Sequence, residues 1–299
     1  MHIIFERACF FGGMVINTWL LTVLNYFKFV GDRKPTQKFG ILPDLKLLCA
    51  VLLSVFVVVL ALYNFADPIF IKWYAEGNTD RAGLFALTTD IGQSHWILIS
   101  SGSIILFMSI YNFPKLSSPH TIHWHHIFLK FYFVFTTIAF SGLAAILFKN
   151  LIGRARPVLH ENYELWLSSP FAGVYHYASF PSGHSTTVGA LAAVLLLIAP
   201  RIGYVFVPVA IWVAISRVAV GAHFPSDIIA GLSLGVIFTW IYARSFARKR
   251  LLFEFGENGE IKLRNLAAKR ARRKIRRREQ SLGDLGFGAI AGPRAAKKA

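Results

Sequence analysis

The sequence predicts an all-α membrane protein, a bundle of about six transmembrane helices. Of its 299 residues, 55% are hydrophobic and only 16% are charged, and the mean hydropathy is +0.51. One soluble core of this size would not bury so much apolar surface. The apolar residues also gather in separate runs, several of them close to the roughly twenty residues that cross a bilayer as a helix.

Six of these runs are predicted to span the membrane, and each boundary is set by polar residues or prolines. The spans lie near residues 47–63, 96–111, 128–148, 184–199, 202–220 and 228–242. Pro200 and Arg201 separate the fourth from the fifth, and the turn at residues 223–226 separates the fifth from the sixth. An earlier apolar stretch, residues 8–27, carries Asn17 and Asn25, which are costly against lipid. It is therefore interpreted as an interfacial helix, with an additional span or an uncleaved signal-like start as alternatives.

The chain is accordingly divided into three parts. Residues 1–43 are an N-terminal segment and cytoplasmic lead-in, residues 44–246 form the membrane domain, and residues 247–299 form a basic cytoplasmic tail. From Arg244 onward there are seventeen Lys and Arg against five Asp and Glu, out of a net charge of +17 for the whole chain. A basic segment next to a membrane favours contact with anionic lipids or a role in fixing the topology over nucleic-acid binding.

Lys and Arg in short flanks predict the orientation in the membrane. Basic residues precede the first span and follow the last, so both flanks are expected in the cytoplasm. With six spans between them, three polar clusters then fall on one outer face: residues 149–157 (KNLIGRARP), 181–184 (PSGH) and 216–227 (SRVAVGAHFPSD). The expected location is the cytoplasmic (inner) membrane, with an external site and a cytoplasmic tail.

The residue types in these clusters indicate chemistry on a phosphate. Lys149, Arg156 and Arg217 offer the fixed positive charge that binds phosphate oxygens and stabilises the transition state. Ser182 and Gly183, at the start of a helix, would add backbone N–H donors. No metal or cofactor is required for these roles.

The two histidines and the aspartate supply the reacting groups. His223 and Asp227 stand four residues apart, which places both on one helix face if the turn continues through Pro225. Asp227 would then orient His223 as the nucleophile, and a phosphohistidine would form. His184 is assigned as the general acid and base that protonates the departing oxygen.

The motifs KxxxxxxRP, PSGH and SRxxxxxHxxxD together resemble the three-part signature of the type 2 phosphatidic acid phosphatase superfamily. The resemblance covers roughly residues 44–246, and every signature position matches. It implies a helical membrane bundle that hydrolyses a phosphate monoester or pyrophosphate of a membrane lipid. By this resemblance the nucleophile is His223, paired with Asp227, and the residues that bind phosphate or assist departure are Lys149, Arg156, Ser182, Gly183, His184 and Arg217.

The substrate is not contained in the signature. Lipid A and undecaprenyl pyrophosphate are favoured, and phosphatidic acid and phosphatidylglycerol phosphate remain open. A phosphotransferase using the same site is one alternative. A non-catalytic transporter or scaffold is another, although it would leave the three clusters unexplained. The group of histidines at 120, 123, 125 and 126 lacks Cys or carboxylate neighbours, so an interfacial loop is expected there in preference to a metal site.

Overall fold

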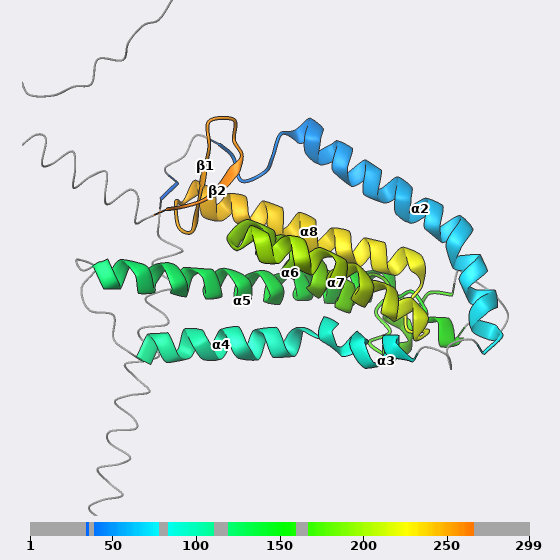
Figure 1. The fold of residues 1–299 in the computed structure, drawn as a ribbon. Helices are drawn as coiled ribbons and strands as arrows, with labels where there is room; N and C mark the ends of the chain where they lie inside the picture. Colours follow the sequence, from blue (N-terminus) through cyan, green and yellow to red (C-terminus); the bar gives the residue numbers. More distant parts are fainter. Residues whose placement is uncertain (1–33, 36–38, 78–82, 111–118, 160–166, 266–299) are drawn as a thin grey trace, which may run out of the picture.

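The computed structural model describes residues 34–35, 39–77, 83–110, 119–159 and 167–265. The predicted all-α fold is confirmed (Figure 1), and each of the six predicted spans coincides with a helix. The helices are α2 (Leu45–Ala75), α3 (Leu84–Thr88), α4 (Ser94–Ile110), α5 (Pro119–Ile152), α6 (Gly183–Ile198), α7 (Pro200–Ala219) and α8 (Pro225–Arg248). Short 3₁₀ turns are η2 (Thr89–Gly92), η3 (Pro157–Leu159) and η4 (Tyr175–Tyr177).

Four helices in the described residues are long and apolar enough to cross a membrane: α2, residues 123–152 of α5, α7 and α8. The segment 84–92 and α4 would count as a fifth span, bent by 42° at the break between them. The sixteen residues of α6 reach only about 24 Å at 1.5 Å per residue, short of a 30 Å hydrocarbon core. The chain is thus a helical membrane bundle, and the count of six spans stays a prediction.

The two prolines that marked turns begin helices, as expected of a residue that lacks an N–H and has a fixed φ. Pro200 is the first residue of α7, and Pro225 is the first of α8. At the start of α2, the side chain of Asp44 accepts a hydrogen bond from Lys46 N at 3.2 Å and so caps the helix.

Two sequence-based expectations were wrong. Helix α2 continues to Ala75, well beyond the predicted end near residue 63, because buried Asp67 has its charge compensated and does not end the span. The second concerns the histidines near residue 123: His123, His125 and His126 belong to α5, which begins at Pro119, and not to a loop.

Helix α6 lies at the centre of the bundle, packed against α5, α7 and α8 (Figure 1). Its approach to α8 depends on glycines, since a Cβ at Gly231 would meet Ser182 O and one at Gly235 would meet Thr186 O. Gly231 and Gly235 on α8 therefore form a close helix interface with α6. Because Ser182 is the N-cap of α6, this packing also fixes the end of the helix that carries the PSGH motif.

A short β-hairpin follows α8, with β1 (Phe253–Phe255) antiparallel to β2 (Ile261–Leu263). Leu251, Leu252 and Phe253 are fully buried and join the core cluster of Phe133 and Phe246. The hairpin was not predicted from the sequence, which assigned residues 247–299 to the tail. The predicted interfacial helix at 8–27 and most of the basic tail, from residue 266, lie outside the described residues. The three-part division of the chain stays a prediction.

Candidate active site

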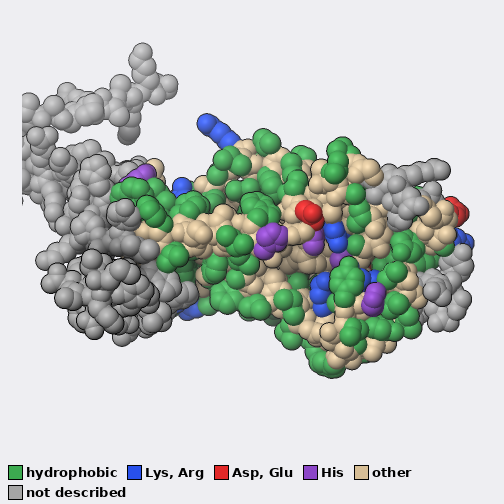
Figure 2. Space-filling view, turned by 90° about the horizontal axis from the view of Figure 1, so that it is seen from below, with side chains coloured by type: hydrophobic (Ala, Val, Ile, Leu, Met, Phe, Trp, Pro, Cys, Tyr) green, Lys and Arg blue, Asp and Glu red, His purple; other side chains and the backbone are tan. Residues whose placement is uncertain are grey.

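The three polar clusters meet at one end of the bundle. This end combines the last residues of α5 and α7 with the first residues of α6 and α8, and it lies away from the hairpin (Figure 1). Figure 2 shows Lys, Arg and His side chains gathered in one region of a largely apolar face. The three clusters, expected on one outer face of the membrane, thus lie together at one end of the bundle, and the side of the membrane that this end faces stays a prediction.

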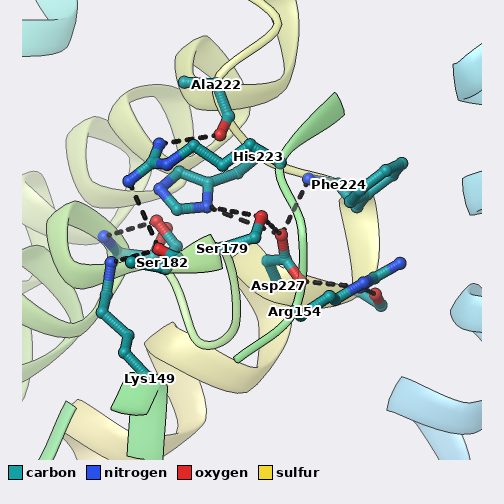
Figure 3. A network of polar contacts seen from close by, with 12 residues as sticks. Lys149, Arg154, Ser179, Ser182, Ala222, His223, Phe224 and Asp227 are labelled. Atoms are coloured by element: carbon teal, nitrogen blue, oxygen red, sulfur yellow. Dashed lines mark hydrogen bonds and ion pairs between the residues drawn. The ribbon is translucent and has the colours of Figure 1, made fainter. Parts of the chain in front are cut away.

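His223 and Asp227 form a buried pair (Figure 3). The Nδ1 atom of His223 lies 3.5 Å from Asp227 Oδ2, and the two side chains are 2% and 0% exposed. Ser179 Oγ donates to the same carboxylate oxygen at 2.5 Å and lies 3.5 Å from His223 Nδ1. With Nδ1 facing Asp227, Nε2 is the ring nitrogen left to react with a phosphorus atom.

The pair is built differently from the expected helix face. Helix α8 begins only at Pro225, so His223 belongs to the preceding turn. Asp227 is in the first turn of α8, and its Oδ2 accepts a hydrogen bond from Phe224 N at 3.0 Å. This hydrogen bond holds the turn before α8 against the N-terminus of the helix, so that His223 lies next to Asp227. Burial lowers the pKa of His223 to about 3, against the opposing effect of the hydrogen bond and charge of Asp227.

The cations on the first motif converge on one carbonyl. Lys149 Nζ donates to Ala178 O at 2.9 Å, and Arg156 Nη2 donates to the same oxygen at 3.3 Å. Arg156 Nη1 also donates to Ala222 O at 2.9 Å, next to His223. Carbonyl oxygens thus occupy donors that a phosphate would compete for. A cavity of about 220 Å³, lined in part by Tyr175 and Ala178, opens beside Lys149.

Arg217 reaches the same region from the end of α7. Its Nη1 donates to Thr89 Oγ1 at 2.7 Å, while its Nε is buried without a partner among the described residues. A buried N–H of a charged group without an acceptor is costly. An anion bound here would satisfy it.

The N-terminus of α6 adds neutral donors. Ser182 caps the helix, with its Oγ 3.4 Å from Ser185 N, and Gly183 and His184 are the first helical residues. Their N–H groups have no carbonyl within the helix to bond, which is the usual arrangement at an anion site. The ring of His184 packs against Gly92 and lies within electrostatic reach of Lys149, Arg156 and Arg217.

Sequence reasoning missed several residues that the structure adds to this site. Arg154 lies inside the first motif but was not singled out, and it contacts both Asp227 and Asp67. Ser179 lies two residues before the first residue of the second motif, Pro181. Tyr175 stacks on Arg156, with 3.8 Å between the guanidinium carbon and the ring centroid. The only sequence signal for Asp67 was a carboxylate within an apolar run.

Comparison with known proteins shows the family to which the chain is related. The model of the PAP2 superfamily matches residues 130–251. A lipid A 1-phosphatase of Rhizobium johnstonii is 37% identical over 76% of this chain and 92% of that protein. A lipid A 1-phosphatase of Rhizobium etli is 37% identical over 73% of this chain and 93% of that protein. An undecaprenyl-diphosphatase of Sulfolobus acidocaldarius is 44% identical, but over only 21% of this chain and 30% of that protein.

The fold, the three motifs and these relatives define a membrane-bound lipid phosphatase. The chain belongs to the PAP2 superfamily, the family of type 2 phosphatidic acid phosphatases that its motifs resemble.

Proposed function

We propose that this phosphatase removes the 1-phosphate of lipid A through a phosphohistidine on His223. The observation that carries the reaction is the buried His223–Asp227 pair set among Lys149, Arg156 and Arg217 at one end of the bundle. The choice of lipid is supported by the two Rhizobium lipid A 1-phosphatases, which this chain matches over more than nine-tenths of their length. The undecaprenyl-diphosphatase match is confined to a fifth of this chain.

In the first step Nε2 of neutral His223 attacks phosphorus. The N–P bond forms as the bond from phosphorus to the lipid oxygen breaks, and His184 donates a proton to that oxygen. The Nδ1–H of His223 donates a hydrogen bond to Asp227, which stabilises the positive charge that develops on the ring. Lys149, Arg156, Arg217 and the N–H groups of Gly183 and His184 hold the equatorial phosphate oxygens.

In the second step water takes the place of the lipid. His184, now neutral, accepts a proton from the water, whose oxygen attacks phosphorus. The N–P bond breaks, inorganic phosphate leaves and neutral His223 is restored. A phosphotransferase would pass the same group to another hydroxyl, so a product analysis separates the two activities.

The proposed setting is the outer face of the cytoplasmic membrane. The basic residues before α2 and after α8 support a cytoplasmic location for those ends, and hence for the basic tail, which would contact anionic lipid. The site would then open outward, where it receives the phosphate while the acyl chains stay in hydrocarbon.

The test is phosphate release from lipid A in detergent with EDTA present, with undecaprenyl pyrophosphate, phosphatidic acid and phosphatidylglycerol phosphate assayed beside it. Lipid A is expected to be the best substrate, and chelator is expected to leave its rate unchanged. His223→Ala should lose at least about 10³-fold in kcat and His184→Ala about 10²- to 10⁴-fold. Exposed His123, at the other end of the bundle, supplies the control His123→Ala with full activity expected. Activity retained in His223→Ala would refute the phosphohistidine.

A further inference from the structure

A second buried ion pair, between Asp67 and Arg154, adjoins the His223–Asp227 pair. Asp67, on α2, is fully buried, although α2 is long and apolar enough to cross a membrane. It accepts hydrogen bonds from Ser226 N at 3.0 Å and Ser226 Oγ at 2.5 Å, and it pairs with Arg154 at 2.8 Å. A carboxylate this deep is expensive to bury. Both partners are next to Asp227: Ser226 precedes it in the sequence, and Arg154 forms an ion pair with it.

Arg154 is shared between two carboxylates. Its Nη1 lies 2.7 Å from Asp227 Oδ1, and its Nη2 lies 2.8 Å from Asp67 Oδ2 (Figure 3 shows the Asp227 contact). The guanidinium carbon is 4.2 Å from the ring centroid of Phe224 and 5.0 Å from that of Tyr63. The side chains of Asp67 and Asp227 are fully buried and that of Arg154 is only 8% exposed, so these charges act on one another with little screening by solvent.

The cluster therefore holds two carboxylates and one guanidinium, a net charge of about minus one beside His223. Without Asp67, Arg154 would neutralise Asp227 alone, and the cluster would be neutral. The phosphorylated imidazole keeps a proton on Nδ1 and is cationic, so it needs a net negative neighbour.

We propose that Asp67 is a positioning residue for phosphoryl transfer, which offsets the charge of Arg154 so that Asp227 keeps its full charge for the cationic phosphohistidine. This inference rests on the proposed function. It also explains why α2 must lie against the start of α8: the helix brings a charge as well as apolar surface. If the Asp67–Arg154 ion pair served only to hold α2 in place, the activity would not depend on the net charge of the cluster.

The test uses variants that alter charge with little change of shape, assayed for kcat and KM with lipid A. Asp67→Asn keeps an acceptor for Ser226 and makes the cluster neutral, so kcat is expected to fall about 10- to 100-fold with KM nearly unchanged. The double variant Asp67→Asn with Arg154→Gln restores a net charge of minus one. It is expected to be at least tenfold more active than Asp67→Asn alone.

Two further variants make each outcome decisive. Asp44→Asn alters a carboxylate at the other end of α2, where Asn caps as well as Asp, and should keep full activity. A double variant no more active than Asp67→Asn, or full activity in Asp67→Asn, would overturn the proposal. If Asp67→Asn does not fold, Asp67→Glu takes its place: activity within tenfold of the unchanged protein is expected, and a loss beyond 100-fold in folded protein rejects the charge role.

Failure of the proposed function would give different assay results from failure of the Asp67 inference. If the unchanged protein released no phosphate from any lipid, or if His223→Ala stayed active, the phosphohistidine mechanism itself would be wrong. If both behaved as expected and only the Asp67 variants did not, the inference alone would fail.

Discussion

His223 is buried as a neutral base. Its Nδ1 faces the Asp227 carboxylate, whose remaining acceptor positions are taken by Ser179, Phe224 N and Arg154. Every oxygen of Asp227 is thus committed, so the carboxylate cannot rotate away from the imidazole without breaking several bonds. For the proposed nucleophile, this means that the imidazole would have a fixed orientation and an available Nε2 before the lipid binds.

The depressed pKa of His223 predicts a pH-dependent stability. Because the folded pKa of about 3 lies below the unfolded value of about 6.5, the unfolded chain binds a proton first as pH falls. Stability from this group is complete above pH 6.5 and is lost downward toward pH 3. Between pH 6.5 and 4.5 the unchanged protein should lose about 2 kcal/mol more of its unfolding free energy than His223→Gln, in unfolding experiments in detergent. Parallel curves for the two proteins would show that His223 is protonated when folded.

The residues proposed to act on phosphate could be selected from the sequence because the chemistry restricts their type. Arg, His and Asp at fixed spacings are rare at the edges of apolar runs, so Lys149, Arg156 and His223 could be found without a structure. Arg154 belongs to the same motif as Lys149 and Arg156, but its partner Asp67 is 87 residues away on α2. No local spacing connects them, and only the packing of α2 on α8 reveals the pair.

At the scale of elements, α6 and α8 position the site together. The N-terminus of α6 presents Gly183 and His184, and that of α8 presents Asp227, so the distance between the two helix starts sets the distance between the reacting groups. Gly231 lets the Ser182 carbonyl approach α8 closely, and Ser182 N donates to Asp227 O at 3.1 Å. Helix packing and catalytic geometry are therefore one constraint here.

The close packing of α6 on α8 predicts that one added methyl group, as in Gly231→Ala, lowers both stability and activity. Gly231→Ala places a Cβ against Ser182 O, and the helices must separate by several tenths of an ångström, which destabilises the fold by about 1–3 kcal/mol. Activity should fall more than about tenfold at temperatures where the protein is still folded. The matched control is Gly142→Ala on α5, where nothing lies within 4 Å of the added atom. Thermal unfolding and phosphate release are measured for both, and equal behaviour of the two variants would disprove the role of the close approach.

Helices were predicted well where apolar runs and prolines agreed, as for α7 and α8. The end of α2 was missed because Asp67 and Pro68 look like a break in a span, whereas a tertiary ion pair supports the carboxylate. The hairpin after α8 was missed because three-residue strands leave no periodicity to read. Its burial depends on Phe133 in α5, a contact between distant segments.

The whole molecule separates two polar ends by a wide apolar surface. Along α2, large side chains such as Leu53, Phe65 and Ile69 are more than 60% exposed, which only a lipid environment makes favourable. The phosphate site lies at one end of α8, and the hairpin lies at the other (Figure 1). The 24 residues of α8 span roughly 36 Å, enough to place the two ends on opposite sides of a bilayer.

This arrangement permits a direct test of orientation, since both ends carry exposed positions. In a background with Cys9→Ser and Cys49→Ser, single cysteines are introduced as Ala172→Cys at the site end and Glu257→Cys in the hairpin. A maleimide that cannot cross membranes is added to spheroplasts and to lysed cells. Because basic residues flank the hairpin end, the cysteine at 172 should react in intact spheroplasts and the one at 257 only after lysis. The reverse pattern would place the phosphate site in the cytoplasm, and its substrate would then have to come from the inner leaflet.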